Sequence, residues 1–300
     1  MGYVYLLCVA MMFSFGGTCV KLISPYFSAE FITFFRFLVG VFFLLVLKLI
    51  KGHKFRADFR QVFKTMFFWI LFGAVAKWLA YLSENTALSQ GMSYGNIVVM
   101  PMQTTCITLF SVFLFKDRMT KRQVGSMILC MAGVLMISWN GRPLGEFFGQ
   151  NVIQMILFLC AGVCAAGHVL TQKMVADKMD IIDSNLLIFS ISCVFAFLPL
   201  VPDIADGALT GVRPDLPCIL AILAFGFITG IGFYLNAKAI PLVPFYMVPI
   251  IQSMMAIFAI IWGVLFFHES ISAYVICGTL MFMVGLVGLQ LKSRKGTKHD

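Results

Sequence analysis

Long apolar segments separated by short polar connections recur along the whole chain. Charge clusters and Gly, Pro and Asn residues divide it into predicted helices of about 20 residues, the length needed to cross a hydrocarbon core. The predicted spans are 3–23, 28–50, 65–88, 93–115, 121–139, 151–172, 184–201, 217–238, 245–267 and 273–291. The pattern therefore predicts an all-α integral membrane protein with ten transmembrane helices.

The composition excludes a water-soluble globule. Of the 300 residues, 61% are hydrophobic and only 12% are charged, against about 25% charged in soluble domains. The net charge of +9 does not indicate a nucleic-acid partner, because the basic residues punctuate apolar runs instead of gathering on one face. The nine cysteines lie almost entirely in apolar runs without a Cys-x-x-Cys pair, which predicts small buried residues and neither disulfides nor a metal site.

The distribution of positive charge predicts the orientation in the membrane. If the N-terminus is cytoplasmic, the inner connections and the C-terminal tail hold 17 Lys and Arg residues, whereas the outer connections hold only Arg142 and Arg213. Positive residues are retained on the cytoplasmic side of membrane proteins. We therefore expect both termini to be cytoplasmic and the protein to be a multi-pass protein of the cell (plasma or inner) membrane.

Short sequence motifs of the first half of the chain recur in the second half. Phe72-Gly73 recurs 153 positions later as Phe225-Gly226, and Tyr81 recurs at the same distance as Tyr234. Five spans per half is an odd number, so the second half is predicted to be inverted in the membrane, as in many secondary transporters. The expected five-helix repeats are residues 1–144 and 145–300.

Further short motifs in both halves resemble those of a known protein family. The first half contains Arg36-Phe37, Glu84-Asn85-Thr86-Ala87-Leu88, Pro101, Lys116-Asp117-Arg118-Met119-Thr120, Gly125 and Gly133. The second half contains His268-Glu269-Ser270-Ile271-Ser272, Gly278 and Gly285, but it has Asn236-Ala237-Lys238 opposite Ser83-Glu84-Asn85. With these words the chain resembles the drug/metabolite transporter superfamily, in its EamA-like branch. The resemblance implies ten helices in two EamA repeats, alternating access, and export or exchange of small metabolites, and it does not name the cargo.

Polar side chains inside the apolar spans are the candidate site residues, because an ionisable group in hydrocarbon costs roughly 2.5–3.5 kcal/mol. Lys77 is the strongest candidate, since it lies too deep in the third span for its stem to reach water. It is either neutralised or paired inside the bundle, or it presents an ammonium to the substrate. Tyr81 and Glu84 share its helix face and Trp78 adjoins it, so all four are candidate binding residues.

Two glutamines are predicted near the level of Lys77. Gln103 lies in the fourth span, and Gln252-Ser253 occupies the middle of the ninth. Prolines nearby interrupt both helices, which is typical of midplane sites in repeat transporters. We expect Gln103, Gln252 and Ser253 to belong to a binding ring; the alternative is that each glutamine forms an interhelical hydrogen bond.

Five residues are candidates for coupling or gating. Glu84 is predicted either to couple protons near the outer mouth or to bond neighbouring helix ends, and Arg36 either to take part in coupling or to balance charge in the packing. His168 either gates and carries protons or lies at the interface. Tyr234, also a candidate binding residue, is expected to close the inner path as Tyr81 closes the outer one, unless both anchor helices in the aromatic belts.

Together these features predict a secondary active transporter and no enzyme. A lysine near two glutamines favours a small solute with a carboxylate, such as an amino acid or a related metabolite. The alternative is an amine or quaternary-ammonium cation held by Glu84 and aromatic rings. No ATP-binding loop is present, so a gradient or an exchange is expected to drive transport.

An intramembrane Mg²⁺-dependent transferase is the rival from another class. Asp177, Asp180 and Asp183 are typical of the first aspartate cluster of such an enzyme, but the remaining aspartates lie in an outer connection, whereas a diphosphate clamp needs both clusters on one side. We therefore expect no cofactor, and the expected partners are the solute and the lipid bilayer. Stripes of glycine in the fifth and tenth spans suit packing within one chain or in a homodimer.

Overall fold

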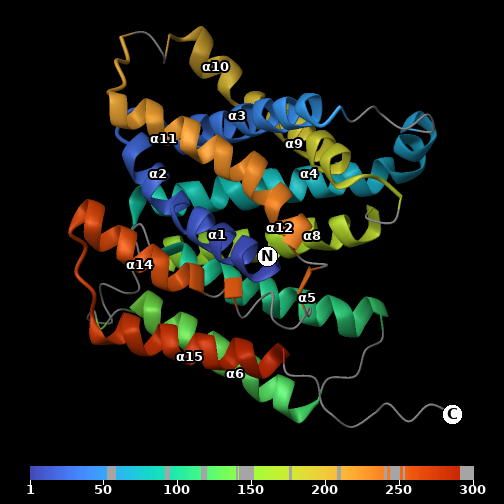
Figure 1. The fold of residues 1–300 in the computed structure, drawn as a ribbon. Coiled ribbons are helices and arrows are strands. Elements are labelled where there is room, and N and C mark those ends of the chain that lie inside the picture. Colours follow the sequence, from blue (N-terminus) through green and yellow to red (C-terminus); the bar gives the residue numbers. More distant parts are fainter. Residues whose placement is uncertain are drawn as a thin grey trace, which may run out of the picture.

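The computed structural model describes residues 1–52, 59–91, 95–115, 120–139, 141, 152–175, 178–207, 211–239, 242–243, 251–252 and 254–290. Within these ranges the secondary structure is helical and contains no β-strand (Figure 1). Helices that are long and apolar enough to cross a membrane are Gly2–Ile23, Ala29–Ile50, Phe63–Gln90, Val152–Val175 and Leu216–Ala239. Shorter apolar helices are Ile181–Phe197, Met254–Phe267 and Ala273–Gly288.

The first half contains two features that the apolar pattern does not predict. Its first span is divided at Phe15, and its fourth span begins with a 3₁₀ turn. A capping box starts the fifth span, because the Gln123 side chain accepts from the Thr120 backbone N–H (2.9 Å) and Thr120 Oγ1 accepts from the Gln123 N–H (3.3 Å). The elements are α1 (Gly2–Ser14), α2 (Gly16–Ile23), α3 (Ala29–Ile50), α4 (Phe59–Gln90), η1 (Gly95–Val98), α5 (Val99–Phe115) and α6 (Lys121–Trp139).

Aspartate caps begin two helices of the second half. Asp180 accepts a hydrogen bond from the Ile182 N–H (2.8 Å), and Asp215 accepts one from the Cys218 N–H (2.9 Å). The span that follows Asp215 contains a five-residue π-helical turn. The elements are α8 (Val152–Val175), α9 (Ile181–Phe197), α10 (Leu200–Ala205), α11 (Leu216–Phe227), η3 (Ile228–Gly232), α12 (Phe233–Ala239), α14 (Met254–Phe267) and α15 (Ala273–Gln290).

Helices of the two halves interleave. In the first half α4 packs against α8 and α9, and in the second half α11 packs against α2 and α3 while α12 packs against α1. Helices α6 and α15 lie side by side at the bottom of Figure 1, where a Cβ on Gly133 would come within 2.6 Å of the Gly278 carbonyl oxygen. This packing encloses a cavity between the helices of both halves.

Candidate functional site

A central cavity of about 150 Å³ brings together most of the predicted site residues. Its walls come from α1, α3, α4, η1, α5, α8 and α12, together with Gln252 and Met255. The predicted site residues that line it are Arg36, Lys77, Tyr81, Glu84, Gln103, His168 and Gln252. Residues from both halves therefore meet around one space, which is where a repeat transporter is expected to hold its solute.

Lys77 is a buried lysine without a carboxylate partner among the residues that the structure describes. Lys77 is 5% exposed. Its Nζ lies 4.1 Å from the ring centroids of both Tyr81 and Phe233. Within the described residues it forms no ion pair and no hydrogen bond. Aromatic faces attract a cation but do not neutralise its charge. When Lys77 is protonated, no described residue of the cavity wall pairs with its charge.

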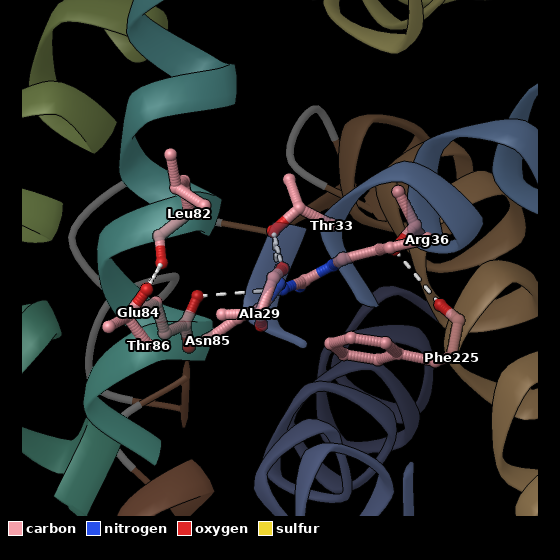
Figure 2. Close-up of polar contacts among 9 residues, drawn as sticks. Ala29, Thr33, Arg36, Leu82, Glu84, Asn85, Thr86 and Phe225 are labelled. Atoms are coloured by element: carbon pink, nitrogen blue, oxygen red, sulfur yellow. Dashed lines mark hydrogen bonds and ion pairs between the residues drawn. The ribbon is translucent and has the colours of Figure 1, made fainter. Parts of the chain in front are cut away.

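Arg36, by contrast, has partners on several sides (Figure 2). Its Nη1 lies 3.6 Å from Glu84 Oε2. Its Nε donates a hydrogen bond to Thr229 Oγ1 at 3.0 Å. The guanidinium carbon also lies 3.2 Å from the Tyr81 ring centroid and 4.1 Å from that of Phe225. The carboxylate of Glu84 thus faces the guanidinium, and the charge of Arg36 is balanced within the protein.

The residues after Glu84 hold α4 against α3. Asn85 is fully buried and its Nδ2 donates to Thr33 Oγ1 at 2.9 Å, while the Thr33 hydroxyl donates to the Ala29 carbonyl at 2.7 Å (Figure 2). The next hydroxyl, that of Thr86, donates to the Leu82 carbonyl within α4. The Glu-Asn-Thr word therefore joins two helices and places one carboxylate at the cavity.

The two predicted glutamines line the cavity in different ways. Gln252 donates from Nε2 to Asn236 Oδ1 at 2.7 Å, whereas Gln103 makes no hydrogen bond to any described residue. Ser253, the third residue of the predicted ring, lies outside the described residues.

His168 is buried in the wall of the central cavity. It is 1% exposed, its ring is 6.3 Å from that of Phe189 and 6.2 Å from that of Phe233, and neither ring nitrogen has a hydrogen-bond partner among the described residues. Two aromatic rings thus fix the imidazole beside the site.

Two predicted site residues lie away from the central cavity. Trp78 stacks on Phe195 with ring centroids 5.8 Å apart. Tyr234 lies in a second pocket, where its ring centroid is 4.1 Å from Lys51 Nζ and its hydroxyl accepts a hydrogen bond from that ammonium. Neither contacts the space that holds the other candidates, so their binding roles stay predictions.

The sequence analysis missed three polar residues of the cavity wall. Gln172 donates from Nε2 to Asn185 Oδ1 at 3.0 Å, and Asn236 accepts from Gln252. Asn96 is 2% exposed, and its Oδ1 has no hydrogen-bond partner within the described chain. Asn96 follows Gly95 at the start of a predicted span, where a polar residue is read as part of a connection. The burial of Asn96 between the helices identifies it as part of the cavity wall, and the sequence does not show that burial.

A family model decides the classification. The model of the EamA-like transporter family matches residues 1–139 and 152–291, one stretch in each half of the chain. The chain belongs to the EamA-like transporter family. This EamA-like protein is therefore a multi-pass membrane protein of the drug/metabolite transporter type, a family whose members are transporters and not enzymes.

The fold of this EamA-like protein is also found among solved structures. One structure, described only as the crystal structure of a protein, has a TM-score of 0.67 and 15% sequence identity; the alignment covers 97% of this chain and 98% of the other. At that identity the match shows the fold alone. A search of curated proteins found no match.

Proposed function

We propose that this EamA-like protein is a secondary active transporter that binds a small carboxylate-bearing solute, such as an amino acid or a related metabolite, in the central cavity. The observation that carries the proposal is the ammonium of Lys77, which lines the cavity without a carboxylate partner among the described residues. Glu84 already balances the charge of Arg36. The charge of Lys77 is therefore left without a carboxylate on the described wall. A solute carboxylate supplies the missing negative charge.

Other parts of the wall suit the rest of such a solute. The amide of Gln103 is available to hydrogen-bond a carboxylate or another polar group. Phe13, Met100 and Met255 add apolar surface for the body of the molecule. A few placed polar groups in a mostly apolar pocket are typical of small-molecule sites.

A cationic solute is the second candidate. Glu84 and the Tyr81 ring both line the cavity and would hold an amine by charge and cation–π attraction. The ion pair with Arg36 weighs against it, since an amine would have to displace the guanidinium from Glu84. The transferase alternative has less support, because Asp180 caps α9 and Asp183 pairs with Lys48. Asp177, the remaining aspartate of that run, lies outside the described residues.

We further propose alternating access through ten spans in two inverted repeats, 1–144 and 145–300, with both termini in the cytoplasm of the plasma or inner membrane and with export or exchange as the direction. The interleaved packing supports this arrangement, because α4 contacts α8 and α9 as its counterpart, α11 with α12, contacts α1, α2 and α3. The cytoplasmic orientation rests on the predominance of Lys and Arg in the inner connections.

A thermal-shift screen against amino acids, organic acids and amines, followed by uptake into proteoliposomes, tests the proposal. Lys77→Gln is expected to weaken binding and transport of the stabilising carboxylate by about tenfold to a hundredfold, because a charge-assisted contact is lost. Lys64→Gln removes an exposed lysine of the same helix outside the cavity and should leave transport unchanged. Selective stabilisation by amines, or full transport by Lys77→Gln, would contradict the proposal.

A further inference from the structure

A second pocket lies where the C-terminal end of α3 meets α12 and the N-terminal end of α9. It has a volume of about 350 Å³ and includes Lys51, Asp180, Tyr234, Lys238 and Leu242 in its lining. Lys51, Asp180, Lys238 and Leu242 are exposed, so the pocket opens at the surface of the bundle. It shares no lining residue with the central cavity.

The charges of this pocket favour an anion. Lys51 and Lys238 come from different halves of the chain, and neither forms an ion pair with any residue that the structure describes. Lys51 contacts Tyr234, and Lys238 Nζ lies 5.5 Å from the ring centroid of Tyr5. Asp180 contributes the one carboxylate of the described lining, and its Oδ1 is engaged by the Ile182 N–H at 2.8 Å.

The surroundings of the pocket are apolar. Ile181 and Leu242 belong to its lining and are 40% and 53% exposed, and Leu49 and Ile50 at the end of α3 are 79% and 78% exposed. In a membrane protein such exposed apolar side chains meet lipid, and lysines beside them mark the level of the headgroups. A ligand that fits both parts has a negatively charged head and a hydrocarbon tail.

We propose that this pocket binds the phosphate headgroup of an anionic phospholipid from the membrane leaflet at this end of the helices. The two ammonium groups and the Tyr234 hydroxyl donate to the phosphate oxygens, while the first part of an acyl chain lies along Ile181 and Leu242. Basic pockets between transmembrane helices hold anionic headgroups in the same way. This binding is independent of the solute that the central cavity takes.

Titration of the purified full-length protein in neutral detergent tests the site. Short-chain phosphatidylglycerol is expected to raise the unfolding temperature in a saturable manner, whereas phosphatidylcholine of equal chain length has little effect. Lys51→Gln/Lys238→Gln should raise the half-saturating concentration at least about tenfold, since each lysine contributes to phosphate attraction. Lys51→Arg/Lys238→Arg should keep it within about threefold, because the charge is retained.

Lys64→Gln is the matched control, because it removes an exposed lysine of α4 outside the pocket. It should bind phosphatidylglycerol like the unaltered protein. Equal weakening by Lys64→Gln, or none by the double glutamine variant, would mean diffuse surface attraction and would overturn the proposal. Equal stabilisation by soluble glycerol phosphate at the same concentration would assign the pocket to a free phosphoester and overturn the lipid as its source. None of these measurements involves transport, so they succeed or fail separately from the proposed function.

Discussion

At the scale of single residues, two buried lysines have different partners. Lys48 Nζ lies 2.5 Å from Asp183 Oδ1, and the two side chains are 8% and 7% exposed. Lys77 is equally buried and has only ring contacts within the described chain. The first lysine holds α3 to α9, whereas the second is the one that we propose to bind the solute. The two lysines are therefore similarly buried, and they differ in that only Lys48 has a carboxylate partner among the described residues.

Lys48→Met tests the structural role of the first pair. It leaves the Asp183 carboxylate buried without its ammonium, which is expected to lower the free energy of unfolding by about 3 kcal/mol. Adding Asp183→Asn removes the stranded charge and should recover much of that loss, as a double-mutant cycle of coupled groups requires. Thermal unfolding in detergent measures Lys48→Met, Asp183→Asn and the double variant. Equal and additive losses would show that the two groups do not interact in solution.

The sequence predicted the charged members of the site better than the others. Lys77, Glu84 and Arg36 interrupt apolar runs, and hydrocarbon makes such interruptions costly, so their inward direction could be inferred. Trp78 could not be placed, because a membrane helix is apolar towards lipid and towards its neighbours, and the sequence does not distinguish the two faces. Asn96 was missed because a span boundary and a buried turn look alike in sequence.

At the scale of elements, the apolar pattern predicted where helices lie but not where they break. The predicted span 121–139 coincides with α6, whereas 3–23 is divided at Phe15 and 217–238 contains η3. Length and hydropathy determine whether a segment suits the membrane. A change of winding within it depends on the neighbouring helices, as at Gly230, where a Cβ would come within 2.6 Å of the Gly40 carbonyl oxygen.

The contact between α6 and α15 provides a prediction at this scale. Gly133→Ala places a methyl group 2.6 Å from the Gly278 carbonyl oxygen and 2.8 Å from the Phe282 nitrogen, so the two backbones must separate. We expect a loss of about 1–3 kcal/mol in unfolding free energy. Gly125→Ala is the matched control in α6, since nothing lies within 4 Å of its Cβ, and it should be neutral or slightly stabilising. Equal unfolding temperatures for the two variants would reject a tight glycine contact.

At the scale of the whole molecule, alternating access predicts different roles for Tyr81 and Tyr234. Tyr81 is 5% exposed beside the central cavity, and Tyr234 contacts Lys51 at the proposed cytoplasmic end. Tyr81→Ala is expected to raise, and Tyr234→Ala to lower, the labelling of a cysteine at position 165 of the cavity wall by an impermeant reagent added outside. The background replaces the native cysteines. Exposed Tyr3→Ala serves as the control, and parallel or absent changes for the first two variants would reject the gates.

The π-helical turn η3 makes these two tyrosines unequal partners. Phe72 and Tyr81 are nine positions apart, as are Phe225 and Tyr234, so their phase along an uninterrupted helix would be the same. A π turn is wider than an α turn, and over five residues the chain rotates less by roughly a quarter of a revolution. Tyr81 therefore faces the cavity, whereas Tyr234 points to Lys51. The two halves therefore differ in backbone winding at this turn. An exchange of side chains between the halves would not remove the resulting difference between Tyr81 and Tyr234.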